Sequence, residues 1–566
     1  MKIKGNNIKT NSVEIYDTTL RDGTQGEGFS LSTDDKLMIA DILDELGVDY
    51  IEGGFPSSNP GDKKFFQLIS KGRLKHAKPV AFGSTRRKNN PAAKDHGLLI
   101  LCNTPVEWAA IFGKSWDLHV REVLKASLEE NLGIISDSIS FLKKEGKKVF
   151  FDAEHFFDGF KNNEEYAVKS LKAALDAGAE KVVLCDTNGG LLPHEITNTV
   201  ERLKSFYKID PLKLGIHTHN DSDCAVANTI AAVNCGVRHV QGTINGYGER
   251  TGNANLSSII PNLELKLHLD AIGKQKLHNL AKLSRIVDEI SNNIPANKMP
   301  YVGDSAFTHK AGMHADAVLK NPESYEHISP SSVGNKRRFL ISSLSGKGNI
   351  AAKAKELGLD TGALTLENEV KLLKKIKSDE EKGYSYESAD ASFKLLFDRY
   401  LSQYANKTKY VTGKALDYVN NYFDLISYRI NVEKKSRTKI FSEAVVMIKV
   451  NGKEEHSVAA GDGPVNALDN ALRKALVRFY PVLDEMKLTD FKVRVINDRT
   501  RTGTASYVRV LIESSDKKDK WSTIGVSENI IEASYQALAD SINYKLDKDG
   551  IKINPEPKNT AKKKRK

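Results

Sequence analysis

From Val13 to Gly248 the chain alternates between short, β-rich apolar runs and longer stretches with helical periodicity. Near-continuous apolar strands separated by helices are typical of parallel strands that are covered on both faces. Eight strand–helix units within roughly 240 residues match the number of units and the length of a (β/α)8 or TIM barrel. We therefore predict an α/β fold that opens with such a barrel. Its predicted strands are Val13–Tyr16, Tyr50–Phe55, Pro79–Phe82, Leu98–Cys102, Val149–Asp152, Val182–Cys185, Leu214–His217 and His239–Thr243.

The helix between the first two strands has signals at both ends. Ser32 and Asp35 stand at the spacing of a capping pair, with Ser32 as the N-cap. Gly47 stands where a C-terminal cap belongs. Between them, one buried stripe is predicted at i, i+3, i+4 and i+7, formed by Ile39, Ile42, Leu43 and Leu46.

The last third of the chain contains two similar helical segments, Gly463–Leu472 and Asn529–Leu538. Each follows about three strand-like segments, which predicts an internal duplication of a βββα unit. Because 566 residues are too many for one hydrophobic core, we expect several domains. The predicted parts are the barrel (1–275), a helical linker region (276–429), a C-terminal α+β domain with the duplicated units (430–550) and a basic tail (551–566).

The net charge of +11 is concentrated at the C-terminus, where the tail supplies six positive charges and leaves 11 − 6 = +5 for the rest. A solvated, disordered tail is the expectation, and nucleic acid is not expected as a partner because basic and aromatic residues do not interleave elsewhere. No apolar run approaches the ~20 residues of a membrane helix. The polar segment Met1–Thr10 lacks the apolar centre of a signal peptide, so a cytoplasmic location is predicted.

A metal site is predicted at the carboxyl ends of the strands, where TIM barrels carry their active sites. His217 and His219 are two residues apart on the seventh strand, so both imidazoles face the same side. An HxH pair alone arises often by chance. Here Asp22, which follows the first strand, and the amide oxygen of Asn253 complete a mixed nitrogen and oxygen site. Such ligands suit Zn, Mn or Mg and do not choose among them.

Three further polar residues on the same rim fit a carbonyl condensation. Arg21 is placed to offset negative charge that develops on an enolate or alkoxide. Glu154 can take or relay a proton, and Thr187 can hydrogen-bond a substrate carboxylate. The alternatives are a surface ion pair for Arg21 and Asp22 and a helix N-cap for Thr187.

These residues lie in motifs that resemble a known family. Asp17–Gln25, His217–His219 and Gly252–Asn255 resemble the signature motifs of the acyl-CoA condensing branch of the metallolyase-type TIM barrels, the isopropylmalate, homocitrate and citramalate synthases. The longer stretches Asp17–Gly28, Glu52–Pro56 and Asp152–Gly159 look like the citramalate synthase subgroup. The resemblance covers nearly the whole chain except the basic tail.

The resemblance implies a role for each matching position. Metal ligation falls to Asp22, His217 and His219, with Asn253 as a further ligand or close contact. Arg21 stabilises the transition state, and Glu154 and Thr187 serve the oxo acid. His314, in a motif of the family's subdomain, is implied to be a base that reaches the partner subunit's site, with Tyr325 beside it. Asp152 departs from the pattern, because related synthases place an aromatic residue at this substrate-binding position.

The implied reaction condenses acetyl-CoA with pyruvate and hydrolyses the product to (R)-citramalate and CoA, the first step of a pyruvate route to isoleucine. The enzyme would then be a homodimeric acyltransferase with a catalytic barrel, and residues 430–550 would form its regulatory and dimerisation domain, with isoleucine as the expected feedback inhibitor. A larger 2-oxo acid, as in isopropylmalate or homocitrate synthase, is the first alternative. A carbon–carbon lyase is a second, although lyase relatives generally lack the duplicated unit. A non-catalytic amino-acid sensor is a third, against which the complete set of metal ligands and Arg21 argues.

Overall fold

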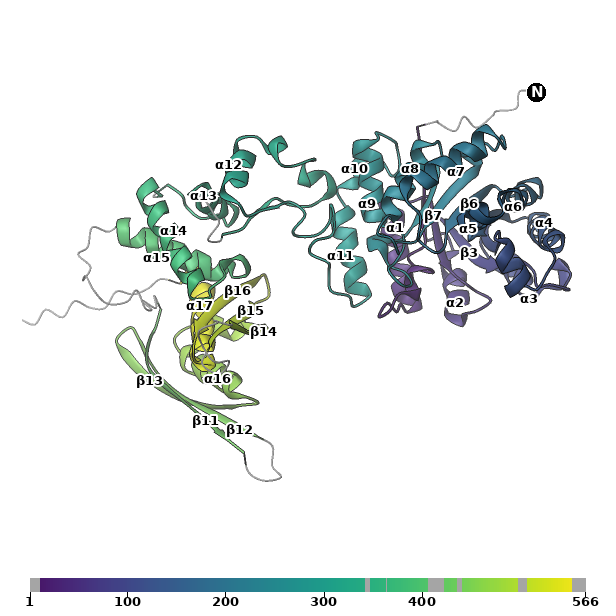
Figure 1. The fold of residues 1–566 in the computed structure, drawn as a ribbon. Coiled ribbons are helices and arrows are strands. Elements are labelled where there is room, and N and C mark those ends of the chain that lie inside the picture. Colours follow the sequence, from purple (N-terminus) through teal and green to yellow (C-terminus); the bar gives the residue numbers. More distant parts are fainter. Residues whose placement is uncertain are drawn as a thin grey trace, which may run out of the picture. The chain divides into compact units, whose positions relative to one another are not determined.

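The computed structural model describes residues 11–341, 347–362, 364–405, 422–434, 440–496 and 506–551 (Figure 1). They form two compact units. Unit 1 holds the described residues up to Phe307 together with His327–Arg337, and unit 2 holds Thr308–Glu326 and the described residues from Arg338 onward. The predicted basic tail, apart from Ile551, lies outside the described residues.

Unit 1 is a closed barrel of eight strands in sequential order, and each strand pairs in parallel with its neighbours. The TIM barrel predicted from the alternating pattern is therefore confirmed. The strands are β1 (Glu14–Asp17), β2 (Tyr50–Gly54), β3 (Lys78–Ser84), β4 (Trp108–Lys114), β5 (Lys148–Glu154), β6 (Lys181–Asp186), β7 (Leu214–Thr218) and β8 (His239–Gly242).

The prediction of the fourth strand at Leu98–Cys102 is wrong. These residues lie inside helix α3 (His96–Asn103), and the fourth strand is Trp108–Lys114. Asp95 explains the helix, because its side chain accepts hydrogen bonds from the backbone N–H groups of Gly97 and Leu98 as an N-cap. A short apolar run does not by itself distinguish a strand from a buried helical turn, and here the cap decides.

Helices surround the strands of unit 1 (Figure 1). They are α1 (Thr33–Leu46), α2 (Pro60–Ile69), α3, α4 (Leu128–Lys144), α5 (Phe156–Asn162), α6 (Glu164–Asp176), α7 (Pro193–Ser205), α8 (Ala225–Asn234), α9 (Leu256–Pro261), α10 (Lys274–Leu277) and α11 (Leu280–Ile290). The capping box of Ser32 and Asp35 on α1 is confirmed, and Gly47 ends the helix with φ of 99°. This positive φ is the conformation that favours glycine at a helix C-terminus.

Aromatic side chains fill the barrel below the site. Tyr16, Tyr50, Trp108 and Phe150 are buried together, with ring centroids of contacting pairs 4.8–6.0 Å apart. Because side chains alternate along a strand, the residue two positions beyond Phe150, Asp152, faces the same side. The packed layer therefore forms a rigid floor under the polar residues at the strand ends.

Unit 2 contains the predicted duplication, which is confirmed. Strands β11 (Asp424–Glu433), β12 (Phe441–Val450) and β13 (Lys453–Gly461) precede helix α16 (Pro464–Leu476), and β14 (Lys487–Ile496), β15 (Tyr507–Ser515) and β16 (Lys520–Ser527) precede α17 (Ile530–Lys548). Each group of three strands is an antiparallel sheet. The buried faces of the two helices and the inner faces of the sheets share one hydrophobic cluster.

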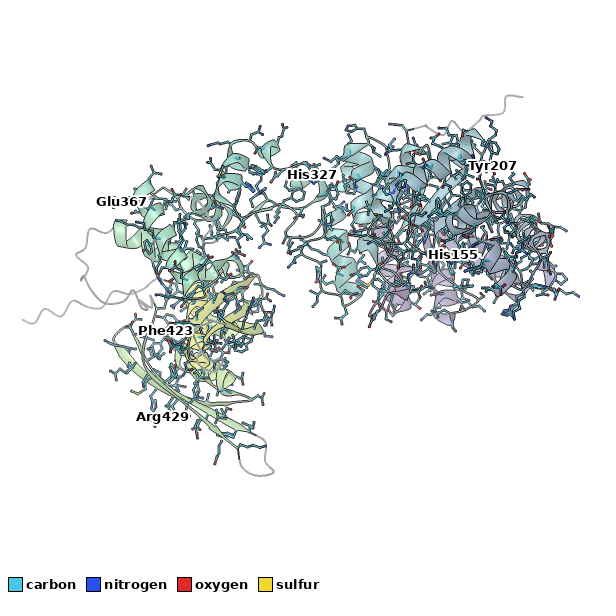
Figure 2. The ribbon with its side chains drawn as sticks, in the orientation of Figure 1. His155, Tyr207, His327, Glu367, Phe423 and Arg429 are labelled. Carbon is cyan, nitrogen blue, oxygen red and sulfur yellow. The ribbon has the colours of Figure 1, made fainter. Side chains whose placement is uncertain are left out.

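The rest of unit 2 is helical, with α12 (Gly312–Lys320), α13 (Lys347–Glu356), α14 (Leu366–Glu381) and α15 (Asp390–Ala405) and a two-residue pairing of β9 (Thr308–His309) with β10 (Arg338–Phe339). Figure 2 shows the side chains of both units, with Phe423 just before β11 and Arg429 within it. Among the described residues, no helix combines the length and apolarity that a bilayer span requires.

Candidate active site and metal centre

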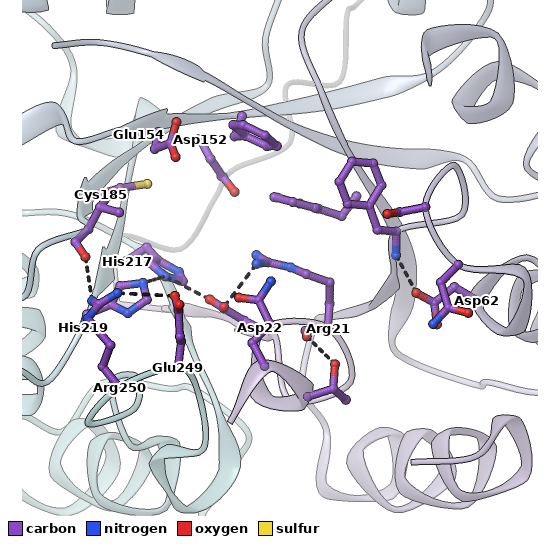
Figure 3. A pocket seen from close by; sticks show the side chains of 18 residues that line it. Arg21, Asp22, Asp62, Asp152, Glu154, Cys185, His217, His219, Glu249 and Arg250 are labelled. Atoms are coloured by element: carbon purple, nitrogen blue, oxygen red, sulfur yellow. Dashed lines mark hydrogen bonds and ion pairs between the residues drawn. The ribbon is translucent and has the colours of Figure 1, made fainter. Parts of the chain in front are cut away.

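A pocket of about 430 Å³ lies at the carboxyl ends of the barrel strands (Figure 3). Seven of the predicted site residues line it: Arg21, Asp22, Asp152, Glu154, Thr187, His217 and His219. The site was predicted at the carboxyl ends of the barrel strands, and the pocket is lined there by residues on β5 and β7 and by residues in the segments that follow strands such as β1 and β6. Phe55, Phe82 and Phe112 add an apolar wall, with the Phe82 ring packed against the other two.

Asp22, His217 and His219 form a compact group of metal-ligand type. The distance from Asp22 Oδ2 to His217 Nε2 is 3.3 Å, and that from His217 Nε2 to His219 Nε2 is also 3.3 Å. Two ligand atoms that each lie ~2.1 Å from one ion are separated by roughly 3.0–3.4 Å. All three side chains are buried, and their ligand atoms lie within 4.8 Å of one another. The donor set and its spacing fit one divalent ion.

The protonation of Asp22 and His219 suits a cation, whereas His217 must lose a proton when a metal binds, because, although burial opposes its charge, Asp22 raises the pKa of His217. Burial together with the charge of His217 lowers the pKa of His219 to about 3, so its imidazole is neutral at physiological pH and keeps a lone pair. Burial opposes the charge of Asp22, but Arg21 and His217 hold the pKa of this carboxyl well below its usual range. A neutral imidazole and a carboxylate are the forms that bind metals.

Asn253 lies beside this group, paired with His219 in an isolated β-bridge. Its Nδ2 donates to the backbone oxygen of Tyr247 at 3.1 Å. Its Oδ1 is buried and has no hydrogen-bond partner among the described residues. Gly252, with φ of 93°, forms the turn before it. A buried amide oxygen without a partner is unusual and fits the predicted role as a further metal contact.

Arg21 is held by three contacts. Its Nε donates to Glu52 Oε1 at 2.5 Å, and its Nη1 lies 3.2 Å from Asp22 Oδ1. The guanidinium carbon lies 3.8 Å from the centroid of the Phe82 ring. Since the side chains of Arg21 and Asp22 are only 12% and 4% exposed, the alternative of a surface ion pair is wrong. Figure 3 shows Arg21 beside Asp22 at the pocket.

The sequence reasoning assigned no role to Glu52 or Gln241, two buried polar residues of the site. Glu52 lies on β2 and also accepts a 2.5 Å hydrogen bond from the hydroxyl of Tyr16. Gln241 lies on β8 and contacts His217 Nδ1 through Oε1 at 3.0 Å. Glu52 is the one charged residue of β2, and Gln241 directly follows the apolar Val240 on β8, so a polar residue within a buried strand was the available signal. Glu52 also belongs to one of the motifs that carried the resemblance.

Glu154 and Thr187 are both tied to neighbouring residues. Glu154 forms an ion pair with Lys114, its register partner on β4. The Thr187 hydroxyl accepts a hydrogen bond from the backbone N–H of His155 at 2.9 Å. Helix α7, the next after Thr187, begins at Pro193 with Leu192 as its N-cap, so the alternative of Thr187 as a helix cap is wrong.

Asp152 brings a carboxyl group to the pocket wall. Burial and the nearby charge of Glu52 raise the pKa of Asp152 to about 7, although Arg21 opposes the shift. Its Oδ1 accepts a hydrogen bond from Gln241 at 3.3 Å. The pocket therefore combines an aromatic wall with a carboxyl group, where an aromatic residue was expected from the resemblance.

His314 and Tyr325 lie together in unit 2, whereas the pocket residues belong to unit 1. Their rings stack with centroids 4.2 Å apart, and both side chains are exposed. The structure confirms that the two residues are neighbours. Their delivery to the site of a partner subunit stays a prediction.

The fold and the site together define a TIM-barrel enzyme with a candidate divalent-metal centre at its strand ends. Three family models match successive parts of the chain: HMGL-like over residues 12–287, homocitrate synthase post-HMGL domain-like over 301–382, and LeuA allosteric (dimerisation) domain over 389–546. The matches follow the order of barrel, helical region and duplicated unit.

Curated relatives resemble the chain over nearly its full length. The (R)-citramalate synthases of Geobacter sulfurreducens and Aquifex aeolicus are each 52% identical over 540 residues, which cover 95% of this chain and 98% of theirs. A 2-isopropylmalate synthase of Methanocaldococcus jannaschii is 32% identical over 538 residues, covering 95% of both chains. The chain belongs to the (R)-citramalate synthase family.

Proposed function

We propose that this protein is an (R)-citramalate synthase, an acyltransferase that condenses acetyl-CoA with pyruvate and water to give (R)-citramalate and CoA. The observation that carries the proposal is the combination of 52% identity over 95% of the chain with a complete Asp22, His217 and His219 group in the pocket. The reaction is the first step of a pyruvate route to isoleucine.

The pocket residues have separate roles in the condensation. Asp22, His217 and His219, with Asn253 beside them, would hold a divalent ion, which when bound would supply Lewis-acid polarisation of the ketone of a 2-oxo acid. Arg21, fixed by Glu52 and Phe82, presents a permanent positive charge to the oxygen on which negative charge develops. Its charge is already in place before the reaction, so little reorganisation is needed.

Two further residues of unit 1 serve proton transfer and binding. Glu154 takes or relays a proton, and it forms an ion pair with Lys114 of the neighbouring strand β4. The Thr187 hydroxyl accepts a backbone hydrogen bond and therefore has its own proton free to donate to a substrate carboxylate. His314, beside Tyr325, is proposed as the base that removes a proton from the methyl group of acetyl-CoA.

The second candidate is the same reaction on a larger 2-oxo acid, as in isopropylmalate or homocitrate synthase. Asp152 argues against both larger acids, because a carboxyl group in the pocket wall is a poor neighbour for the branched alkyl group of 2-oxoisovalerate and, when ionised, repels the second carboxylate of 2-oxoglutarate. The test is a thiol-release assay with acetyl-CoA and, in turn, pyruvate, 2-oxoisovalerate and 2-oxoglutarate. Pyruvate is expected to give the highest kcat/KM, and a preference for either larger acid would reassign the substrate.

The remaining parts of the proposal concern cofactor, assembly and control. The metal is Mn, Zn or Mg, since the ligands suit all three. The match to an allosteric (dimerisation) domain supports a homodimer that is inhibited by an amino acid, for which isoleucine is the candidate as end product of the route. A cytoplasmic location is proposed, because the substrates are metabolites of central metabolism.

A further inference from the structure

A chain of hydrogen bonds runs from the pocket wall to a metal ligand. Gln241, fully buried on β8, has its Oε1 3.0 Å from His217 Nδ1. Its Nε2 donates to Asp152 Oδ1 at 3.3 Å. Asp152 lines the pocket from β5, and His217 comes from β7. Three strands thus contribute one residue each to a connected path.

The path fixes the position of one proton. An amide has one accepting end and one donating end, whereas the ionised carboxylate of Asp152 only accepts. Asp152 therefore requires the Nε2 end of Gln241, and the Oε1 end must face His217. An oxygen that only accepts requires neutral His217, the form that binds a metal, to carry its proton on Nδ1. The lone pair of His217 is then on Nε2, the atom 3.3 Å from both Asp22 and His219.

The reverse orientation of Gln241 would oppose metal binding. Nε2 of Gln241 would then donate to His217 Nδ1, and the proton of a neutral His217 would be on Nε2, between Asp22 and His219. Oε1 of Gln241 would face a carboxylate oxygen of Asp152, an arrangement of two acceptors with no proton between them. The orientation in the structure avoids both problems.

We propose that Gln241 is a positioning residue that holds His217 in its metal-binding tautomer, and that Asp152 sets the orientation of Gln241. The inference rests on the metal centre of the proposed function. It deepens that function, because it gives Asp152 a second task and connects the wall of the oxo-acid pocket with the metal centre. Residues that hydrogen-bond to the second ring nitrogen of a metal-ligating histidine commonly fix its tautomer and ring orientation.

The test measures Mn²⁺ binding to the full-length protein without substrate, from the electron paramagnetic resonance signal of free Mn²⁺. Gln241→Met keeps the volume but removes both polar ends, and its Kd is expected to rise ~10–100-fold. Gln67→Met is the control, because Gln67 is exposed on α2. This variant is expected to bind Mn²⁺ with the same Kd as the unmodified protein. Equal binding by Gln241→Met and the unmodified protein would overturn the inference.

A reversed pair separates hydrogen bonding from packing. In the double variant Gln241→Glu with Asp152→Asn, the amide at 152 donates to the carboxylate at 241, which still accepts from His217 Nδ1. Its Kd is expected within ~3-fold of the unmodified protein. A double variant that binds as weakly as Gln241→Met would count against the proposed path.

The tautomer of His217 can also be read in the unmodified protein, and a variant serves only to assign its signals. In the Zn²⁺-loaded, ¹⁵N-histidine-labelled protein, the ring nitrogens of His217 are assigned by their loss in His217→Asn. A protonated Nδ1 with an unprotonated Nε2 is expected, and the opposite tautomer would refute the inference. If the unmodified protein binds neither Mn²⁺ nor Zn²⁺, the metal centre itself fails, which is a distinguishable result.

Discussion

Arg21 and Glu52 form a buried ion pair, with Nε of the guanidinium 2.5 Å from Oε1 of the carboxylate. Burial disfavours the charge of Arg21, but Asp22 and Glu52 raise its pKa above the usual value. Glu52 is completely buried and is also bonded to Tyr16 at the floor of the site. The arginine is thus anchored from behind, which leaves its remaining N–H groups for the pocket.

The first prediction concerns this anchoring. Lysine keeps the charge at position 21 but cannot bond Glu52 and Asp22 while stacking on Phe82, because it lacks the planar fork. We expect Arg21→Lys to lower kcat by ~10²-fold or more. The control is Arg73→Lys, because Arg73 pairs with Asp41 at the surface. This variant is expected to leave steady-state kinetics unchanged. A change confined to KM would make Arg21 a substrate-binding group instead.

A second prediction tests metal dependence. Removal of divalent ions by chelation should abolish turnover, and His219→Ala should do the same because it removes one of three grouped ligands. The expected measurement is activity alongside metal content of the purified protein. His76→Ala serves as the control, since His76 is half exposed and lies outside the pocket. Full activity of His219→Ala in metal-free buffer would contradict the metal centre.

The barrel strands show how much of the fold could be predicted from the sequence. Seven of the eight strands lie where the apolar runs predicted them, because a run between a helix end and a polar segment has few other structures available. The exception, Leu98–Cys102, is decided by Asp95, an N-cap that the prediction from the apolar run alone did not use. Apolar periodicity reports burial, and local hydrogen bonds choose the element.

The site shows the same limit. Asp22, His217 and His219 were predicted because strand ends converge on one rim of a barrel. Glu52 and Gln241 were not, because their roles come from contacts across strands: Glu52 with Arg21, and Gln241 with Asp152 and His217. Such contacts depend on the register between strands, which the pattern of one chain does not specify.

The third prediction is a pH dependence of stability. Asp17 is fully buried, and burial raises its pKa to about 7, although Thr19 donates two hydrogen bonds to it. Between the unfolded value near 4 and this folded value, the native state binds more protons than the unfolded state, so this group makes stability fall as pH rises. Asp17→Asn does not titrate and should lack that fall.

The measurement is urea unfolding at pH 5 and pH 7.5, followed by the fluorescence of Trp108 and Trp116 in the barrel. The unfolding free energy of the unmodified protein, relative to Asp17→Asn, is expected to drop on the order of 2 kcal/mol between the two pH values. The same pH dependence in both proteins would mean that Asp17 is ionised throughout this range.

The fourth prediction tests shared active sites. Arg21 belongs to unit 1 and His314 to unit 2. If the proposed shared site is correct, Arg21→Ala and His314→Ala inactivate different parts of it. In a mixed dimer with sites completed by the partner, one of the two sites is intact. Mixing equal amounts should restore about one quarter of full activity, because half of the dimers are mixed in a symmetric assembly. Absence of recovery after verified subunit exchange would place His314 in its own subunit's site.

The last prediction concerns regulation by the duplicated unit, which comprises β11 to α17. Truncation is a poor test, because Ile524 and Val526 of β16 pack with Phe393 and Phe397 of α15, and removal of the duplicated unit would expose that cluster. The two helix N-termini offer a finer test, since free N–H groups and the helix dipole attract the carboxylate of an amino acid. Asn529 already caps α17 with its own side chain, whereas Gly463 gives α16 no side-chain cap.

Gly463→Asp places a competing carboxylate at the start of α16. The substitution is tolerated locally, because Gly463 has an extended backbone and a Cβ there meets no atom within 4 Å. Inhibition by isoleucine should weaken at least ~5-fold in Gly463→Asp, at the lower end of typical coupling between sites. Gly463→Asn caps without charge and should weaken it less, while kcat without isoleucine stays the same in both. If Gly463→Asp is inhibited as strongly as the unmodified protein, the effector binds elsewhere. If the unmodified protein ignores millimolar isoleucine, leucine and valine, the duplicated unit serves assembly alone.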